Sequence, residues 1–193
     1  MKPTIEGIPV VGLDPSLRNW GIAKALLSPG SPQPIHVHSV DVIQPVLPKG
    51  KQVRQNSLDI EAAKQLTSGV LQAVEGAKAV FIEVPVGSQS ARAMASYGIC
   101  VGVLGALRAT GIPFFEVTPT EVKLAGPGSK TATKQDMISW AAQQHPEADW
   151  PTYQKGGKQR ISEAKAEHMA DAVCAIHAGI QSNPFQQLLP FLQ

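Results

Sequence analysis

The chain has 193 residues, of which 43% are hydrophobic and 17% are charged, and its net charge at neutral pH is +2. This length and composition predict a soluble globular protein with a buried core and exclude a disordered one. No apolar run reaches the roughly 18 residues of a membrane span, and the first residues lack the apolar region of a signal peptide, so we expect a cytoplasmic protein. A net charge this small does not by itself indicate a nucleic-acid partner.

The first elements are three predicted strands, at 8–13, 21–27 and 35–43, whose short connections favour antiparallel hairpins. Asp14 follows the first strand directly, and Pro15 begins a run of turn-forming residues. An acid at this place either starts an Asp-Pro turn or is a buried carboxylate that needs a cation or a partner, because an unpaired buried charge is costly. Whether other acids lie near Asp14 decides between the two interpretations.

A loop at 44–56 separates the third strand from a predicted helix, and it carries three cations and no acid. This charge makes the loop a candidate contact for nucleic-acid phosphates, although a solvated loop explains it almost as well. The candidate contact residues are Lys49, Lys51 and Arg54. Ser57 is the expected N-cap of the helix, which ends near Gly76.

A fourth predicted strand, at 78–83, repeats the arrangement at Asp14. An apolar run is followed by Glu83, and Pro85 ends the strand. In an α/β sheet, ligands bind at the carboxyl ends of parallel strands. Two strands with the same arrangement therefore favour a functional site over a surface role for Glu83.

The middle of the chain contains a predicted helix at 89–110, rich in Gly and Ala, and a strand at 112–117. Small residues on this helix allow close approach of the sheet, or of the same helix in a second subunit. Thr133, with Asp136 three residues later, is expected to cap a further helix, and residues 146–161 are expected to form a loop. Lys and Arg outnumber acids in this part of the chain, and we expect them to form one phosphate-binding face. The residues assigned to that face are Lys130, Lys155, Lys158 and Arg160.

The last predicted helix, at 162–180, carries an acid inside an otherwise apolar run. Asp171 lies within the run 169–176, where a capping or surface role fits poorly. His168 lies three residues earlier, so both side chains project from one face of the helix. Carboxylates with an imidazole suit Mg²⁺ or Mn²⁺, and two such ions can promote displacement at a phosphodiester.

This ordered set of motifs resembles the RuvC-type Holliday-junction resolvases of the RNase H-like nuclease superfamily. The resemblance covers roughly 10–179 and rests on Gly12-Leu13-Asp14-Pro15-Ser16 with Gly21, on Val80-Phe81-Ile82-Glu83 and on His168-Met169-Ala170-Asp171-Ala172. It implies an α/β, RNase H-like fold, with a five-stranded mixed sheet of three antiparallel and then two parallel strands, flanked by helices. We divide the chain into a nuclease domain at 1–182 and a C-terminal tail at 183–193.

The resemblance further implies a metal-dependent, structure-selective endonuclease that acts as a homodimer and resolves four-way DNA junctions by paired cuts. Its catalytic residues would bind two Mg²⁺ or Mn²⁺ ions per site, and they are Asp14, Glu83, His168 and Asp171. Lys123 and Lys134 stand in the segments where the family has two basic catalytic residues. The family usually carries an aromatic residue in the loop after its glutamate, whereas residues 84–88 contain none. This difference weakens the case for strict junction specificity.

Other functions stay open at this point. A broader branched-DNA nuclease or a non-catalytic junction-binding protein would share the fold, although the presence of all four site residues argues against a non-catalytic protein. An actin-like or sugar-kinase-like ATPase shares the general fold, but it would need a second phosphate loop and a much longer chain.

The tail is apolar and rich in glutamine. We expect it to pack on the domain or on the dimer partner, and we expect Pro184 to end the preceding helix. The segment Gln187-Leu188-Leu189-Pro190-Phe191 loosely resembles a bacterial sliding-clamp-binding peptide, so a contact with a sliding clamp is a further hypothesis.

Overall fold

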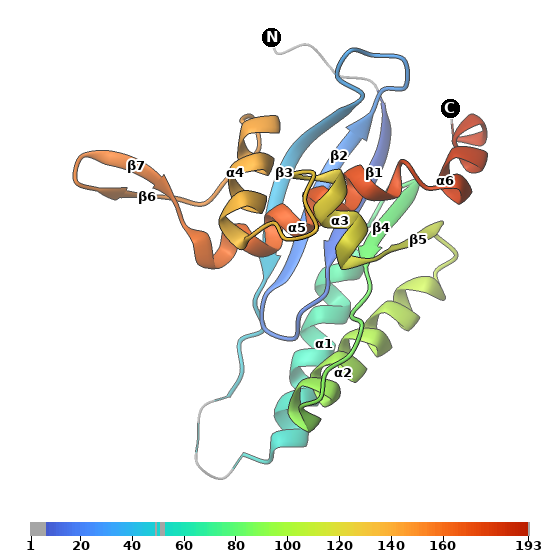
Figure 1. Cartoon of the computed structure of the whole chain (residues 1–193). Helices are drawn as coiled ribbons and strands as arrows, with labels where there is room; N and C mark the ends of the chain where they lie inside the picture. Colours follow the sequence, from blue (N-terminus) through green and yellow to red (C-terminus); the bar gives the residue numbers. More distant parts are fainter. Residues whose placement is uncertain (1–6, 49, 51–52, 193) are drawn as a thin grey trace.

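The structure, a computed structural model, describes residues 7–48, 50 and 53–192 (Figure 1). A five-stranded sheet in the order β3-β2-β1-β4-β5 forms its centre. The strands are β1 (Ile8–Asp14), β2 (Trp20–Leu27), β3 (Ile35–Ile43), β4 (Ala79–Glu83) and β5 (Phe114–Val117). β2 pairs antiparallel with β1 and β3, whereas β4 pairs parallel with β1 and β5. This confirms the predicted sheet of three antiparallel and then two parallel strands.

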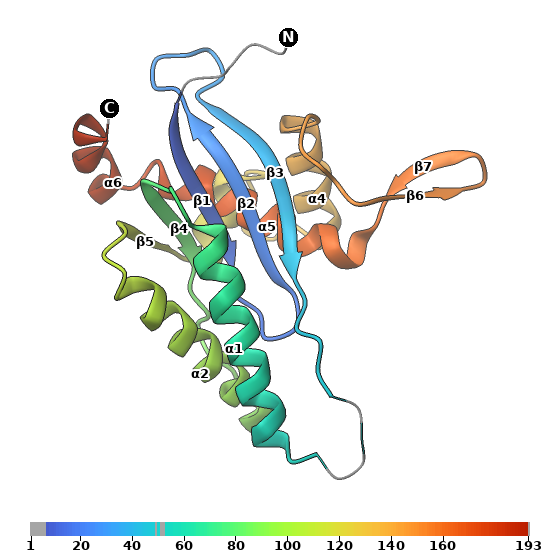
Figure 2. The ribbon, with the colours of Figure 1, turned by 180° about the vertical axis from the view of Figure 1, so that it is seen from behind.

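Helices cover both faces of the sheet (Figures 1 and 2). One face carries α1 (Gln55–Ala73) and α2 (Ala91–Arg108), and the other carries α5 (Glu163–Gly179). Three shorter helices accompany α5, and they are α3 (Pro119–Ala125), α4 (Lys134–Gln144) and α6 (Asn183–Leu188). Among the described residues, no helix has the length and apolar character needed to cross a membrane.

The register of β1 and β4 determines where their terminal acids point. Leu13 and Ile82 are paired across the two strands and pack with α1 and α2, whereas Phe81 packs with α5. Successive side chains of a strand point to opposite faces of the sheet. Asp14 and Glu83, one residue further along each strand, therefore lie side by side on the face that α5 covers.

Two glycines let α5 lie directly on the sheet. A Cβ atom at Gly12 would collide with the carbonyl oxygen of Ala172, and one at Gly21 would collide with that of His168. Any side chain at either position would push α5 away from β1 and β2. The glycines thus set the distance between α5 and the end of β1.

The helix starts follow the predictions in part. α1 begins at Gln55 with Arg54 as its N-cap, so the predicted cap at Ser57 is wrong and that residue lies in the first turn. The predicted cap at Thr133 is confirmed, because its backbone N–H donates to the Asp136 carboxylate and its hydroxyl accepts from the Asp136 N–H, at 2.9 and 3.2 Å. Such a reciprocal capping box satisfies two donors that the helix itself leaves free.

The segment 146–161, predicted as a loop, contains a two-stranded ribbon of β6 (Thr152–Lys155) and β7 (Lys158–Ile161). Its turn is formed by Gly156 and Gly157, whose φ values are 60° and 71°. This left-handed pair of residues is the geometry of the tight hairpin turns that glycine favours. The ribbon projects away from the sheet beside α4 (Figures 1 and 2).

The segment after α5 packs on the domain, as expected. Phe185 of α6 is buried, and its ring meets Phe81 and Phe115 edge-on, with centroids 4.9 and 5.3 Å apart. This aromatic cluster stabilises the end of the chain against β4 and β5. The preceding helix, α5, already ends at Gly179 with Ile180 as its C-cap, so the prediction that Pro184 ends it is wrong. Pro184 instead occupies the first turn of α6, where its fixed φ suits a helix start. The sliding-clamp contact stays a prediction.

A pair of histidines, of which His145 is buried and His177 is half-buried, joins the C-terminal end of α4 to α5. Nε2 of His145 lies 2.8 Å from Nε2 of His177, whose ring Trp140 meets edge-on. Burial lowers the pKa of His177 to about 3. In the unfolded chain the same imidazole is protonated near pH 6.5. Between about pH 3 and about pH 6.5 the unfolded state therefore binds more protons than the folded state. The free energy of unfolding therefore falls as the pH falls below about 6.5, by up to about 1.4 kcal/mol per pH unit.

We expect His177→Gln to lower the melting temperature at about pH 7, where the histidine pair and its packing are intact. The difference in melting temperature from the wild type should shrink as the pH falls to about 4. In this range protonation of His177 in the unfolded state lowers the free energy of unfolding of the wild type, whereas glutamine takes up no proton. Thermal unfolding followed by circular dichroism across this range measures both effects. A difference that stays constant with pH would contradict the assignment.

Candidate active site

Acidic and imidazole side chains meet at the end of the sheet where β1 and β4 finish. Asp14 and Glu83 lie side by side there, and α5 crosses this end of the sheet with His168 and Asp171. Nδ1 of His168 lies 2.6 Å from Oδ2 of Asp14, and the two side chains are only 20% and 15% exposed. The structure therefore brings together the four residues that the sequence predicted to form a site.

The charges of these groups influence one another strongly. Burial raises the pKa of Glu83 to about 7, and the charge of Asp14 adds to this effect. Burial also raises the pKa of Asp171 to about 8, followed in size by the effects of Asp14 and Glu83. Burial lowers the pKa of His168, but the hydrogen bond to Asp14 and the nearby negative charges outweigh it and raise that pKa overall. Burial and mutual repulsion therefore make it unfavourable for all of these carboxyl groups to be ionised at the same time.

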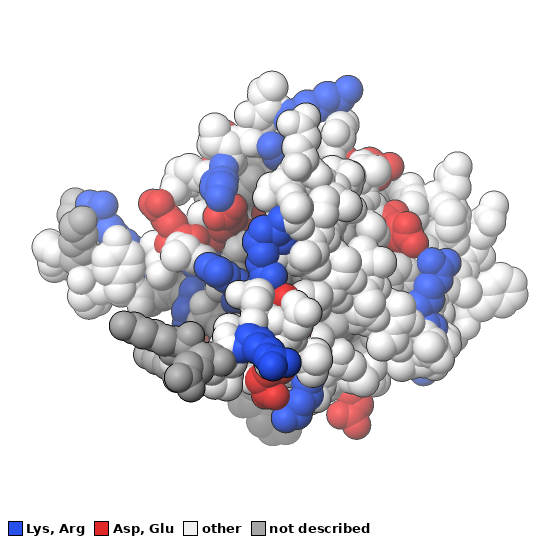
Figure 3. Space-filling view, turned by 90° about the horizontal axis from the view of Figure 1, so that it is seen from below, with Lys and Arg blue, Asp and Glu red and all other residues white. Residues whose placement is uncertain are grey.

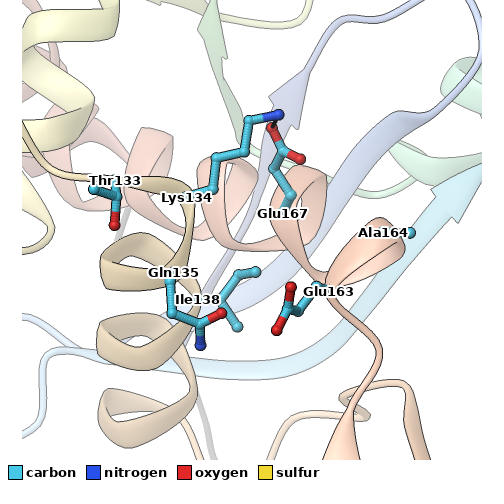
Figure 4. A pocket seen from close by; sticks show the side chains of 7 residues that line it. All are labelled: Thr133, Lys134, Gln135, Ile138, Glu163, Ala164 and Glu167. Atoms are coloured by element: carbon cyan, nitrogen blue, oxygen red, sulfur yellow. Dashed lines mark ion pairs between the residues drawn. The ribbon is translucent and has the colours of Figure 1, made fainter.

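Two lysines lie beside these acids. The charge of Lys123, in α3, lowers the pKa of Glu83 and so opposes the effect of burial. Nζ of Lys134, in the first turn of α4, lies 2.6 Å from Oε1 of Glu167, and Figure 4 shows these side chains meeting between α4 and α5. The pKa of Lys134 is raised, chiefly by Glu167 and further by Asp171. Both lysines predicted from the sequence therefore lie near the acidic group, and Lys134 forms an ion pair with Glu167.

Glu167 is a site residue that the sequence did not single out. It lines a pocket of about 510 Å³ between α4 and α5, together with its partner Lys134 (Figure 4). Glu163, Glu167 and Asp171 recur every fourth residue, which places them on one face of α5. This spacing is the signal that could have identified it.

The remaining basic residues assigned to DNA contact lie on several elements. The exposed ones are Arg54, Lys130 and Arg160. Lys155 and Lys158 belong to the β6–β7 ribbon, and Lys49 and Lys51 lie outside the described residues. Figure 3 looks onto the end of the molecule where β1 and β4 finish and shows Lys and Arg side chains around acidic ones. This distribution is compatible with the predicted phosphate-binding face.

The chemistry of the donor set suits a divalent cation. Three carboxyl groups and an imidazole offer the ligands that Mg²⁺ and Mn²⁺ accept, and a cation would relieve the repulsion between Asp14, Glu83 and Asp171. In the part of the chain that the structure describes, no three His, Cys, Asp or Glu side chains are spaced as a formed metal centre, and Asp14 is bonded to His168 instead. Metal binding by these residues stays a prediction.

Comparison with known proteins identifies the fold. No protein-family model and no curated protein matches the sequence. The structure of Thermus thermophilus RuvC in complex with a Holliday junction substrate matches with a TM-score of 0.64 and 18% identity, over 95% of this chain and 96% of that chain. A second structure of T. thermophilus RuvC gives 0.63 and 19%, over 95% and 97%. The chain has the RuvC fold.

A third structure, with a lower TM-score, agrees with this result. The yeast mitochondrial Holliday junction resolvase Ydc2 matches with a TM-score of 0.56 and 12% identity, over 99% of this chain and 87% of that chain. The RuvC fold confirms the predicted RNase H-like architecture over nearly the whole chain. Identities this low establish architecture, so the chemistry is argued from the residues present here.

Proposed function

We propose that this protein is a metal-dependent, structure-selective DNA endonuclease that resolves four-way junctions by hydrolysing phosphodiester bonds. One observation carries the proposal, namely the convergence of three carboxyl groups and His168 at one end of a RuvC-fold sheet. The T. thermophilus match holds a Holliday junction substrate, and Ydc2 is a Holliday junction resolvase, which supports branched DNA as the substrate class.

The surroundings of each side chain suggest its role. Bound Mg²⁺ or Mn²⁺ would supply Lewis acidity and an activated water. Asp14, Glu83 and Asp171 offer the carboxylates to hold such ions, and His168 keeps the Asp14 carboxylate in place through their 2.6 Å contact. The two lysines of α3 and α4 lie beside the acids, where they would offset the negative charge of the phosphate.

We also propose a homodimer that forms through α2. Met94 and Val101 are exposed on this helix, and Gly98 and Gly105 share their face with open space where a Cβ would lie. The spacing of four, three and four residues is that of a helix seam, and the glycines would let a second copy of α2 approach closely. Two active sites in one dimer fit paired cuts in opposed strands.

Cleavage of a four-way junction, measured beside a flap, a fork and a linear duplex of matched sequence, tests the proposal. We expect paired cuts in the junction that require Mg²⁺ or Mn²⁺ and that are at least about tenfold faster than cuts in the duplex. Equal cleavage of all branched forms would favour the broader branched-DNA nuclease. Junction binding without nicking in either metal would favour a non-catalytic junction-binding protein.

A further inference from the structure

Four of the five histidines of the chain lie near one another, away from the acids at the end of β1. His36 and His38 belong to the edge strand β3, His145 is the C-cap of α4, and His177 lies near the end of α5. Oε1 of Glu147, in the loop after α4, lies 3.5 Å from Nδ1 of His36 and 3.6 Å from Nδ1 of His145. One carboxylate oxygen thus faces two imidazole nitrogens. We call this group the histidine cluster.

The histidine cluster is separate from the candidate active site. His36 pairs with Leu26 of β2, and Leu26 pairs with Pro9 near the start of β1. Asp14 ends that strand, so the cluster lies at its opposite end. On α5, nine residues separate His177 from the histidine that contacts Asp14, which is about 13 Å along the helix axis. Figures 1 and 2 show α4 beside β3, the outermost strand.

The two contacts of Glu147 are longer than those of a strong ion pair. A charge-assisted N–H···O bond measures about 2.7 to 2.9 Å, and the contact between His168 and Asp14 in this same protein measures 2.6 Å. The ligand atoms of a tetrahedral Zn²⁺ lie about 2.0 to 2.2 Å from the ion and therefore about 3.3 to 3.6 Å from one another. The contacts of 3.5 and 3.6 Å to His36 and His145 fall within this range.

His177 supplies the partner that a metal-binding imidazole needs on its second nitrogen. Nε2 of His145 lies 2.8 Å from Nε2 of His177. When the Nε2–H of His145 donates this hydrogen bond, its Nδ1 carries a lone pair and can bind a metal. Such a bond also orients the ring of the ligand. Burial lowers the pKa of His145 and of His177, so both rings are neutral near pH 7, as metal binding requires.

We propose that His36, His145 and Glu147 bind a transition-metal ion such as Zn²⁺, in a site that does not depend on the proposed nuclease function. Two imidazoles and a carboxylate are a recurrent ligand set for Zn²⁺, with water in the fourth position. Within the described residues the three groups do not converge as in a formed centre. Glu147 lies in a loop and its side chain is 39% exposed, so its carboxylate can move to close on an ion. The ion would connect β3 to the C-terminal end of α4, the helix whose first turn carries Lys134.

Calorimetric titration of the metal-free protein with Zn²⁺, in excess Mg²⁺, tests this site. Mg²⁺ prefers oxygen ligands, so it competes for the acids at the end of β1 and leaves imidazoles free. We expect the wild type to bind one Zn²⁺ at the cluster, and His36→Gln and Glu147→Gln each to weaken this binding at least about tenfold. Zn²⁺ should also raise the melting temperature of the wild type more than that of either variant.

Two further variants separate a built site from chance binding at the surface. His177→Phe keeps the ring but removes the nitrogen that accepts from His145, and it should weaken Zn²⁺ binding about tenfold. Asp149→Asn changes an exposed acid two residues beyond Glu147 in the same loop and should leave Zn²⁺ affinity unchanged. Melting of each variant without metal shows whether its fold is retained.

Wild-type Zn²⁺ affinity in both His36→Gln and Glu147→Gln would overturn the proposal, as would a wild-type protein that binds no Zn²⁺ in excess Mg²⁺. An unchanged affinity in a folded His177→Phe would mean an adventitious surface ion and would overturn it too. Asp14→Asn should keep the Zn²⁺ binding of the cluster, because Asp14 lies at the other end of β1. Junction cleavage is a separate readout, so a protein that cuts no junction contradicts the nuclease function and leaves this site standing.

Discussion

Asp14→Asn should reduce metal-dependent cleavage of a four-way junction by about a thousandfold or more and leave junction binding at the wild-type level. Asp14 is the acid that contacts His168, and its charge raises the pKa of both Glu83 and Asp171, so it lies at the centre of the group. An amide has nearly the same shape as the carboxylate but cannot supply the negative charge that a divalent ion requires. Single-turnover cleavage in Mg²⁺ and in Mn²⁺, with binding measured in EDTA, separates the two effects.

Asp149→Asn is the matched control, because this acid is exposed and lies outside the group around Asp14. It should retain cleavage within about twofold of the wild type, since surface substitutions of this kind have small effects. Wild-type cleavage by Asp14→Asn would remove the basis for the nuclease assignment. Loss of junction binding in the same variant would instead show that Asp14 acts in folding or in DNA contact.

Asp171→Asn should stabilise the metal-free protein while it abolishes cleavage. The pKa of Asp171 is about 8 in the folded chain and about 4 when unfolded. Between these values the folded state holds a proton that the unfolded state has released, so the free energy of unfolding falls as the pH rises through this window. Asparagine does not titrate in this range, so the variant keeps the free energy of unfolding that the wild type loses. At about pH 8 this loss is on the order of a few kcal/mol, which corresponds to about 5 °C or more in melting temperature. Below about pH 4 the gain should vanish.

Divalent ions should reverse the order of stability. A cation that binds the folded wild type raises its melting temperature at about pH 8, whereas the variant, with one carboxylate fewer, should gain much less. Calorimetric melting with and without Mn²⁺, at about pH 4 and about pH 8, measures both effects. A variant that is less stable than the wild type at both pH values, or that gains equally from Mn²⁺, would show that Asp171 has a structural role instead.

The centre of the site could be predicted from the sequence because its signals are local. Asp14 and Glu83 each end an apolar strand, and the parallel register then places them side by side without further information. Asp171 was detectable because an acid inside an apolar helical run is rarely buried unless it has a partner or a function. Short connections predicted the three antiparallel strands, whereas the complete five-stranded sheet was implied by the family resemblance and is confirmed by the strand order.

Other features were missed because they depend on distant packing or on a weak pattern. In the sequence Glu167 resembles an ordinary surface acid, and only the packing of α4 against α5 brings Lys134 next to it. The β6–β7 ribbon lacks the alternation of apolar and polar residues that marks a half-buried strand, so only Gly156-Gly157 hinted at its turn.

The placement of α5 across the end of β1 also has a consequence for the time at which activity can arise. The contact between Asp14 and His168 joins residues 154 positions apart. The site therefore cannot form until α5 has been synthesised and has folded onto the end of β1. A nascent or truncated chain that lacks α5 carries only half of the acidic group, and it also leaves one face of the sheet uncovered. The chain must therefore be synthesised through α5 before any metal binding of the proposed kind, and under the proposed function a shorter chain would have no cleavage activity.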